Sequence, residues 1–415
     1  MKRFFLLPLF ALLFFSCANR KVENVQPPAV DSTPIIYRQI NADLKKQQLD
    51  TFFSNRFVDG RFSGCVLIAQ RGIILFEKAF GWANHEKRDS LHLDNSFQLA
   101  SVSKQFTASA VMLLHQEGKL QYDDTLGKYF PHTPWHGLTI RELLTHRCGL
   151  DHYTNVVDNY FISHDTTPSV FSNDSAISMM EDLSPHFVRA PGTKFNYSNT
   201  GYMLLAGVVE KISGQPFWEF MQQNFFAPLG MQHTWIATDG QEHPGKTRGY
   251  FSKWIWWQDN YLDNVTGDKG VYSSVEDMYK WDRSLKNNTI LKKEVLDEAY
   301  KGYSPELEAR KPWNYGFGWR ILKFDDGAMA VFHNGWWHGY TSAFYRGLSD
   351  DVTVVILCNK YNRGIYDVRP ILQILGAHHQ PVDVEENEGD SAADSPHKSV
   401  PAKKSAPEKK RSRKK

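Results

Sequence analysis

The sequence contains little cysteine and no recognisable metal-binding pattern. It has four cysteines in 415 residues, and three of them, Cys65, Cys148 and Cys358, lie beyond the N-terminal segment. An odd number argues against a disulfide framework, and Cys65 and Cys358 sit in apolar runs that are typical of buried free thiols. Neither a CxxC nor an HExxH pattern occurs. We therefore expect no metal site and no organic cofactor.

The chain also lacks a strong overall charge. Its formal net charge is +2, with +8 on residues 398–415 and −6 on residues 383–394, so that residues 1–382 carry a net charge of zero. A body without a basic excess does not favour nucleic acid as a partner. Residues 378–415 are charged and poor in apolar side chains, which predicts a disordered tail.

The N-terminal apolar run is too short to cross a membrane. It covers the twelve residues Phe4–Phe15, whereas a membrane-spanning helix needs about 20. Two basic residues precede the run and Ser16–Cys17 follows it, an arrangement that resembles a bacterial lipoprotein signal. We expect residues 1–17 to be this signal, Cys17 to carry the lipid and residues 18–35 to form a linker. Cleavage without lipid is the alternative; the lipoprotein interpretation predicts a periplasm-facing membrane lipoprotein of the cell envelope.

The first strand-like segments of the sequence lie between two helix-like segments. Two short apolar runs, 65–69 and 73–76, flank a turn at Gly72 and predict a β-hairpin. Residues 37–57 have the apolar spacing of an amphipathic helix. The run Val102–Leu114 is apolar around most of its circumference, which is typical of a buried helix.

Strand character returns near the C-terminus, at residues 316–324, 329–332, 341–345 and 352–357. Because sheet residues lie at both ends of a long helical block, the economical architecture is one α/β domain built from both ends, with an inserted, mostly helical part. The predicted domain covers residues 36–377. Its sheet part is predicted at about 36–90 and 313–377, and its helical part at about 91–312.

The first candidate catalytic pair is Ser101 and Lys104. Three residues apart on a helix, they project from adjacent turns of one face, which brings an amine close to a hydroxyl as serine activation requires. The N-terminus of the helix would also stabilise a developing anion. Two further Ser-x-x-Lys matches, at 395–398 and 412–415, lie in the tail without an apolar helix, so context selects Ser101.

A second group must move protons between nucleophile, leaving group and water. Tyr197 and Asn199 supply a phenol and an amide two residues apart, and Tyr153 with Asn155 form a rival pair. Taken alone, either pair is better explained as a turn closed by asparagine.

A third group is His333-Asn334-Gly335, at the end of the predicted strand 329–332. A donor side chain on a strand edge, followed by glycine, would let a substrate backbone lie along the strand and place a backbone N–H where an oxyanion develops. A surface or core histidine is the alternative.

In this order the three motifs resemble those of the penicillin-recognising serine hydrolases, which include class C β-lactamases, D-alanyl-D-alanine carboxypeptidases and related esterases. Their pattern is Ser-x-x-Lys, then Tyr-x-Asn, then Lys or His-x-Gly. Two flanking stretches, Leu143–Leu150 and Gly270–Met278, are also similar to stretches of that family, with Cys148 replacing a usual serine. The resemblance covers residues 38–376. It implies an antiparallel sheet flanked by helices, the β-lactamase/transpeptidase-like fold.

The resemblance also implies roles for the three candidate catalytic residues. Ser101 would be the acylated nucleophile and Lys104 would help to deprotonate it. Tyr197 would protonate the leaving group and activate the water that hydrolyses the acyl-enzyme. Whether the lysine or the tyrosine is the acylation base stays open. The flanking residues of the motif favour Tyr197 over Tyr153.

Further roles follow for the substrate-binding residues. Asn199 would orient Lys104 and the substrate amide, and His333 would contact a substrate carboxylate or polar group in place of the usual lysine. Gly335 would leave room for the substrate, and the backbone N–H groups of Ser101 and Trp336 would form the oxyanion hole. A tryptophan at 336 departs from the small residue that is usual there.

The resemblance leads to a functional hypothesis with two alternatives. We expect a serine acyl hydrolase acting on a small-molecule or peptide substrate, either a D-amino-acid peptidase or carboxypeptidase or an esterase. A β-lactamase is one alternative, which a histidine at 333 disfavours because it is mostly neutral at pH 7. A catalytically silent binding or sensor module is the other. Trp254, Trp256 and Trp257 are either packing residues or an aromatic wall for the substrate.

Overall fold

The computed structural model describes residues 33–378, apart from 59, 61, 170, 238–241 and 252. The expected signal segment with Cys17 lies outside the described residues, as does the expected tail from residue 379 onward. The last residues of the expected linker, 33–35, belong to the helix α1 (Thr33–Gln39).

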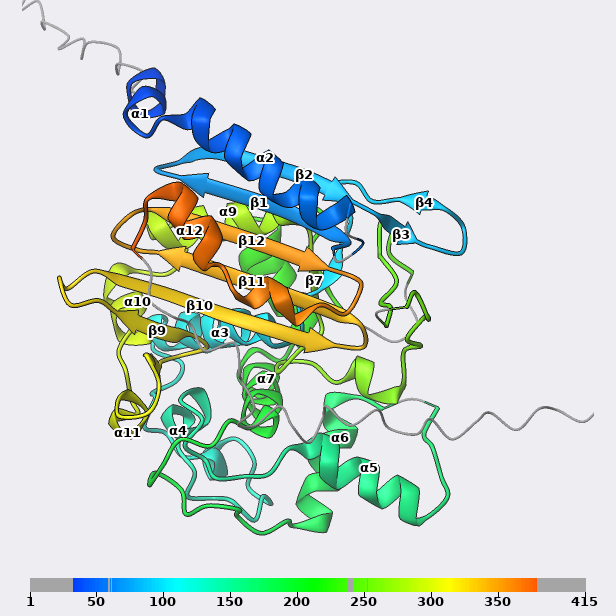
Figure 1. Ribbon diagram of the computed structural model, residues 1–415. Coiled ribbons are helices and arrows are strands. Elements are labelled where there is room, and N and C mark those ends of the chain that lie inside the picture. Colours follow the sequence, from blue (N-terminus) through cyan, green and yellow to red (C-terminus); the bar gives the residue numbers. More distant parts are fainter. Residues whose placement is uncertain are drawn as a thin grey trace, which may run out of the picture.

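A seven-stranded antiparallel sheet forms the centre of the fold (Figure 1). Its strand order is β2-β1-β12-β11-β10-β9-β8, so the first hairpin of the chain pairs with its last strand. Sheet segments from both ends of the sequence therefore meet, which confirms the predicted fold class. The strands are β1 (Gly64–Gln70), β2 (Ile73–Phe80), β8 (Trp313–Tyr315), β9 (Arg320–Lys323), β10 (Met329–Trp337), β11 (Tyr340–Gly347) and β12 (Val352–Cys358).

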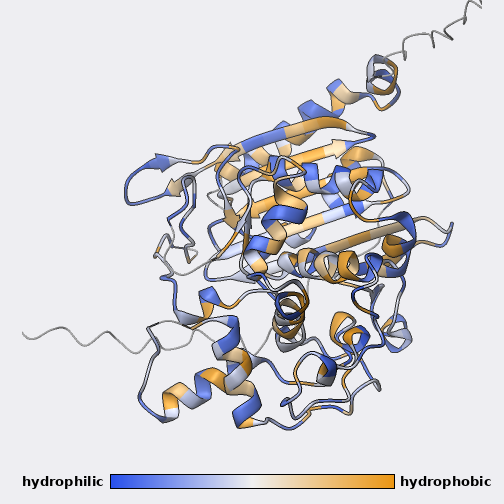
Figure 2. Ribbon diagram, turned by 180° about the vertical axis from the view of Figure 1, so that it is seen from behind, coloured by the Kyte–Doolittle hydropathy of each residue, from blue (hydrophilic) through white to orange (hydrophobic). Residues whose placement is uncertain are grey.

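The central strands divide their side chains between two hydrophobic cores, because successive residues of a strand point to opposite faces. All residues of β1 and β12 are buried, and these strands are among the most hydrophobic elements in Figure 2. The pair Leu67 and Val355 belongs to the core that includes α3 and α9, and the pair Val66 and Ile356 to the core that includes α2 and α12. The helices are α2 (Ala42–Val58), α3 (Lys104–Gln116), α9 (Val275–Asn287) and α12 (Arg369–Leu375).

The single helix expected over residues 37–57 is interrupted. Helix α1 ends at Gln39 and α2 begins at Ala42, and Asn41 between them has a φ of 53°. Asparagine tolerates this left-handed conformation better than most residues. The apolar spacing continues across the break and therefore gave no sign of it.

The chain between the first and last sheet segments is mostly helical. The helix expected over 102–114 is a 3₁₀ turn, η1 (Ala100–Ser103), that leads directly into α3. A small sheet of order β5-β7-β6 lies beside it. The remaining helices of this part are α4 (Ile140–Leu144), α5 (Tyr153–Ser163), α6 (Asn173–Leu183), α7 (Asn199–Ser213), α8 (Phe217–Met221), α10 (Lys293–Ala299) and α11 (Pro305–Glu308), and the strands of the small sheet are β5 (Phe97–Gln98), β6 (Trp235–Ile236) and β7 (Val271–Ser273).

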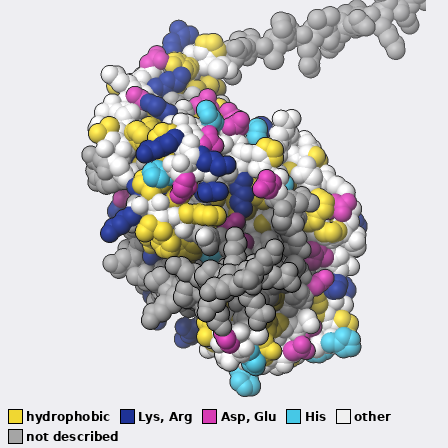
Figure 3. Space-filling model, turned by 90° about the vertical axis from the view of Figure 1, so that its right-hand side faces the viewer, with side chains coloured by type: hydrophobic (Ala, Val, Ile, Leu, Met, Phe, Trp, Pro, Cys, Tyr) yellow, Lys and Arg dark blue, Asp and Glu magenta, His cyan; other side chains and the backbone are white. Residues whose placement is uncertain are grey.

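The face of the molecule drawn in Figure 3 shows no simple charge division. On the face in Figure 3, basic, acidic and hydrophobic side chains are interspersed among the described residues. None of the helices that the structure describes is both long and apolar enough to span a bilayer.

A buried ion pair ties the sheet to α9. The Arg346 guanidinium of β11 contacts the Asp282 carboxylate at 2.5 Å, and the two side chains are 4% and 2% exposed. Arg283 and Thr353 also donate to this carboxylate. Burial opposes ionisation of Asp282, but the two arginines outweigh it and hold its pKa below the ordinary value.

Removing one partner of this pair should destabilise the fold strongly. Arg346→Met should lower the free energy of unfolding by about 3 kcal/mol, because the buried Asp282 carboxylate keeps only Arg283 as a cationic partner. Lys293→Met is the matched control, since Lys293 and Asp297 are 69% and 55% exposed, and it should cost under about 1 kcal/mol. Urea unfolding measures both. Equal losses of unfolding free energy in the two variants would mean that the buried ion pair stabilises the fold no more than the exposed one.

Candidate active site

Ser101 lies on a strained turn between β5 and α3. Ala100, directly before it, has a φ of 48°, which is unfavourable for a residue with a Cβ atom. The Gln98 side chain holds this turn, because its oxygen accepts from the Ala100 N–H at 3.0 Å and from the Gly270 N–H at 3.2 Å. Ser101 is partly exposed, whereas Val102 after it is fully buried. The turn therefore presents the Ser101 hydroxyl at the start of a buried helix.

Lys104 joins three parts of the chain through its ammonium group. Its Nζ donates to Ser101 Oγ at 3.0 Å, to Asn199 Oδ1 at 2.8 Å and to the Asp268 carbonyl at 3.0 Å. The side chain is 0% exposed. As an ammonium it stabilises a negative charge on Ser101 Oγ, and as a neutral amine it can accept the hydroxyl proton. The structure thus places Ser101 beside Lys104, as the motif spacing predicted, and Asn199 beside Lys104, as the family resemblance implied.

Tyr197 lies between cations and histidines. The Lys104 Nζ is 4.8 Å from the centre of its ring and the Arg320 guanidinium carbon is 5.9 Å from it. The His146 ring packs on it at 4.2 Å between centroids. The two positive charges would stabilise a negative charge developing on the phenol oxygen.

Tyr153, the rival in sequence, occupies a different environment. It begins α5, is 0% exposed, and accepts a hydrogen bond from Lys269 while donating to Asp268 Oδ1 at 3.2 Å. Burial, and then the neighbouring Asp268 carboxylate, raise its pKa well above the ordinary value. These contacts are those of a buried structural tyrosine.

Strand β10 passes directly against the Ser101 turn. A Cβ atom on Gly335 would lie 2.3 Å from the Leu99 carbonyl oxygen and 3.0 Å from the Ala100 Cβ. Only glycine lets the strand approach this closely. The Gly335 backbone is also held by a side chain, because the Tyr366 hydroxyl donates to the Gly335 carbonyl at 2.8 Å.

Alternation along β10 gives the direction of the Trp336 N–H. The Met329 carbonyl accepts from Leu348, on the β11 side, and the pairing with β11 runs to Trp337 without a shift in register. Backbone groups of an antiparallel strand alternate between its two edges, so those of Trp336 point away from β11. On that side the pairing with β9 ends at Phe332. The Trp336 N–H therefore points away from β11, one residue beyond the contact of Gly335 with the Ser101 turn.

Comparison with known proteins decides the family. The profile described as Beta-lactamase matches residues 49–378. The chain belongs to the beta-lactamase family. Penicillin-binding protein 4* of Bacillus subtilis is 31% identical over 369 residues, covering 83% of this chain and 79% of the relative. The putative penicillin-binding protein PbpX of the same species is 26% identical, covering 65% of this chain and 64% of its own length.

Solved structures agree with this assignment. The octameric penicillin-binding protein homologue from Pyrococcus abyssi superposes with a TM-score of 0.69 at 25% identity, covering 80% of this chain and 78% of the other. D-amino acid amidase from Ochrobactrum anthropi SV3 shares the fold with a TM-score of 0.65 at 21% identity, covering 81% and 98%. The chain is thus a serine hydrolase with the β-lactamase/transpeptidase-like fold, and the resemblance seen in its motifs is confirmed.

In this beta-lactamase family member, His333 lies 6.3 Å from the Tyr197 ring, measured between centroids. The motif predicted a contact with a substrate carboxylate or polar group, and the side chain is 1% exposed. Its Nδ1 is 2.7 Å from the Asn334 carbonyl and its Nε2 is 3.1 Å from the Tyr315 hydroxyl. Burial, then Arg320 and Lys104, lower the pKa of His333 well below its usual value. The ring is therefore neutral and engaged on both sides, which removes the reason to expect a charged substrate contact.

Several residues at the site had no recognised role in the sequence. Arg320 and Tyr315 come from β9 and β8, and no motif surrounds either of them. His146 lies inside the similar stretch 143–150, which was the one available signal. Asp268 contributes only its carbonyl to Lys104, a role that no side-chain pattern can reveal.

The three tryptophans Trp254, Trp256 and Trp257 differ in their contacts. Trp257 lies 5.7 Å from the Trp336 ring, next to the open edge of β10. Trp254 stacks on His85 at 4.6 Å, and Trp256 lies under the Arg248 guanidinium at 4.3 Å. Trp257 also stacks on Phe251 at 3.8 Å, so all three have packing contacts, and Trp257 additionally contacts Trp336.

One carboxylate–histidine group in the described part of the chain has the spacing of a metal site: Asp259, Asp263 and His338, within 4.8 Å of one another. Its atoms already have protein partners. Asp263 accepts from the Trp337 indole at 2.6 Å and pairs with His338 at 3.2 Å, while Asp259 pairs with Lys246 at 2.9 Å. These ligand atoms serve internal contacts.

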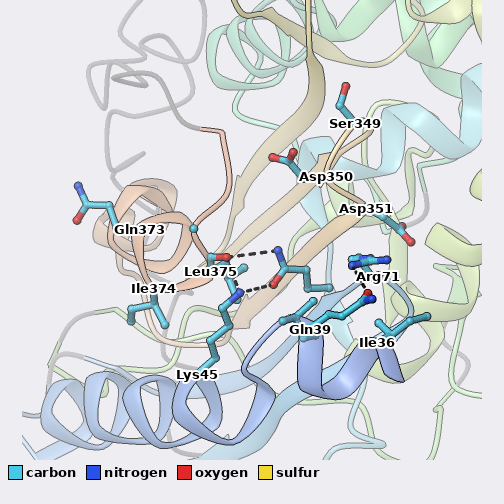
Figure 4. Close-up of a pocket in the computed structure, with 13 residues that line it drawn as sticks. Ile36, Gln39, Lys45, Arg71, Ser349, Asp350, Asp351, Gln373, Ile374 and Leu375 are labelled. Atoms are coloured by element: carbon cyan, nitrogen blue, oxygen red, sulfur yellow. Dashed lines mark hydrogen bonds between the residues drawn. The ribbon is translucent and has the colours of Figure 1, made fainter. Parts of the chain in front are cut away.

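A cavity of about 720 Å³ lies at the other end of the sheet (Figure 4). It is lined by α1 and the start of α2, the β1–β2 turn, the β11–β12 turn and the end of α12. Lys45 crosses it and donates to Gln70 at 2.8 Å and to the Leu375 carbonyl at 2.7 Å. Because β10 reaches Ser101 with its opposite end, this cavity is not part of the catalytic site.

Because His333 is neutral, we expect the preference of the enzyme between a charged and a neutral substrate not to change with pH. The ratio of kcat/KM for a D-Ala-D-Ala peptide to that for a neutral ester should stay constant from about pH 5.5 to 8, because a lowered pKa leaves His333 uncharged throughout this range. His333→Lys should lower activity at least about tenfold, since it adds a third cation beside Lys104 and Arg320. A fall in the ratio with a midpoint near 6.5, abolished in His333→Lys, would show instead that His333 binds the carboxylate as an imidazolium.

Proposed function

We propose that the chain is a D-amino-acid peptidase or carboxypeptidase, or an esterase, that works through an acyl-enzyme on Ser101. The observation that carries this proposal is the triple hydrogen bond of the buried Lys104 Nζ, which joins the nucleophile to Asn199. For stability alone, an apolar residue at this position would serve as well as a buried lysine or better. We therefore assign Lys104 a chemical role.

The proposed reaction follows from the positions of the side chains. Ser101 Oγ attacks the carbonyl carbon and passes its proton to Lys104 or Tyr197. The negative oxygen of the tetrahedral intermediate is stabilised by the N–H groups of Ser101 and Trp336. When the intermediate collapses, Tyr197 protonates the leaving amine or alcohol. Water then attacks the ester on Ser101 and gives a proton to Tyr197. When the second tetrahedral intermediate collapses, this proton passes to Ser101 Oγ, and the acid and free serine are released.

Two observations favour a peptide or ester over a β-lactam. The third motif supplies a buried, neutral His333 where the family's lysine would supply a cation. The open edge of β10 beyond Phe332 suits an extended backbone, which can add to a strand edge. Relatives bear the names penicillin-binding protein and D-amino acid amidase, and EstCE1, a further fold neighbour, is described as a hydrolase with promiscuous acyltransferase activity. A β-lactamase is the second candidate, on the strength of the family.

The substrate class can be tested with four acyl donors. The purified protein should be incubated with a fluorescent penicillin, a D-Ala-D-Ala peptide, a D-amino acid amide and a short p-nitrophenyl ester, with Ser101→Ala as the control. We expect turnover of the peptide, amide or ester that disappears in Ser101→Ala, and at most slow release of the penicilloyl group. Rapid turnover of penicillin would identify a β-lactamase. No acylation by any donor would favour a silent binding module.

We also propose that the protein is a lipoprotein anchored through Cys17 and facing the periplasm. The support is the sequence alone: the apolar run Phe4–Phe15 ends directly before Ser16–Cys17. Such a position would bring the hydrolase close to envelope peptides.

The anchor can be tested by metabolic labelling. Radioactive palmitate should label the wild-type protein in membranes, and Cys17→Ser should abolish the label and move the protein to the soluble fraction. Cys65→Ser, at a buried thiol, is the matched control and should keep the label. A labelled Cys17→Ser protein, or an unlabelled wild type, would contradict lipidation at Cys17.

A further inference from the structure

The hydroxyl of Tyr315 lies between two buried histidines. It is 3.1 Å from His146 Nε2 and 3.1 Å from His333 Nε2. His146 and Tyr315 are 0% exposed and His333 is 1% exposed. The three residues come from the loop after α4, from β8 and from β10, so the hydroxyl is a meeting point of segments far apart in the sequence.

Backbone groups at both ends fix the positions of the protons. The Ser198 N–H donates to His146 Nδ1 at 3.2 Å, so the proton of neutral His146 is on Nε2 and is donated to Tyr315. At the other end, His333 Nδ1 lies 2.7 Å from the Asn334 carbonyl, which can only accept. His333 therefore carries its proton on Nδ1, and its Nε2 accepts from Tyr315. Every hydrogen bond from Ser198 to Asn334 points the same way.

This chain of hydrogen bonds joins two parts of the catalytic site. It begins at Ser198, the residue between Tyr197 and Asn199, and ends at Asn334, directly before Gly335. His146 holds the Tyr197 segment twice, because its own carbonyl also accepts from the Asn196 N–H at 2.7 Å. The chain thus connects the segment of the proposed acid–base residue with the strand of the proposed oxyanion hole, without any expected contact to substrate.

The surrounding charges favour the neutral histidines that this arrangement needs. Lys104 from α3 and Arg320 from β9 face both rings, and His152 also faces His146. Tyr202 of α7 packs on the His146 ring at 5.0 Å. Burial first, and then these cations, lower the pKa of both histidines well below the ordinary value. A proton added to His146 Nδ1 would also point at the Ser198 N–H.

We propose that Tyr315 is a positioning residue for hydrolysis, whose hydroxyl links His146 and His333 into one directed chain that fixes Tyr197 relative to β10. The inference rests on the proposed function of Ser101 and Tyr197. It assigns His333 a task in place of the substrate contact that the motif suggested: His333 transmits the position of the Tyr197 segment to the strand that holds Gly335 and Trp336.

The test compares Tyr315→Phe with Tyr340→Phe in the full chain. Tyr340 is the matched control, because its equally buried hydroxyl donates to the Thr247 carbonyl, outside this chain. Tyr315→Phe removes two buried hydrogen bonds and Tyr340→Phe removes one, so the melting temperature of each variant is measured and kcat is compared well below both. Tyr315→Phe should lower kcat roughly 10- to 100-fold with KM little changed, as expected for misplaced catalytic groups. Tyr340→Phe should keep kcat within about twofold. Equal kcat values in the two variants would overturn the proposal.

A second readout does not depend on turnover. Nitrogen-15 spectra of the wild type should show His146 protonated on Nε2 and His333 protonated on Nδ1, both without change from about pH 5.5 to 8. In Tyr315→Phe the His333 Nε2 resonance should move toward the value of an acceptor without a donor. An unmoved resonance, or a wild-type His333 protonated on Nε2, would overturn the directed chain. If the wild type hydrolyses no substrate but shows these spectra, the proposed function fails and the hydrogen-bond chain stands.

His333→Asn keeps the proposal testable if Tyr315→Phe does not fold. Asparagine can still donate to the Asn334 carbonyl but has no acceptor within reach of Tyr315. It should reproduce the loss of kcat. Where both single variants fold, the double variant should lose no more than either one, because both remove the same link. Additive losses would show that Tyr315 and His333 act separately.

Discussion

The site depends on one buried ammonium group. Lys104 is enclosed by protein, and its charge is stabilised by Ser101, Asn199 and the Asp268 carbonyl, which each accept a hydrogen bond from Nζ. Each acceptor belongs to a different part of the chain: the turn before α3, the first residue of α7, and the loop before β7. The same contacts that neutralise the cost of burying a charge therefore hold the catalytic segments in register.

The arrangement of the sheet makes this convergence possible. The first hairpin pairs with the last strand, so β10 is carried into the interior of the sheet and its far end is brought against the Ser101 turn. Gly335 marks the contact, where a side chain would collide with Leu99 and Ala100. A second layer, formed by His146, Tyr315 and His333, lies behind the groups that are expected to meet substrate.

The sequence predicted most of what local patterns can encode. Ser101 and Lys104 were found because a motif opened an apolar helix, and the flanks of Tyr197 separated it from Tyr153. The break at Asn41 was missed, since apolar periodicity does not register a single left-handed residue. Arg320 and Tyr315 were missed because the pairing of β8, β9 and β10 brings them to the site. No sequence motif near either residue indicates that pairing. The burial of His333 depends on those same neighbours, and for this reason the sequence did not distinguish a substrate contact from a core histidine.

The limited length of the open edge of β10 has a consequence for the protein's behaviour in solution. An unpaired strand edge attracts other strands, and long flat edges lead to self-association. Here β9 covers the strand up to Phe332, and the strand ends at Trp337. Such a short segment offers few backbone groups for pairing with a strand from another copy. Under the proposed function it would still align a few residues of an extended peptide, so substrate binding and protection from edge-to-edge association would follow from the same short length.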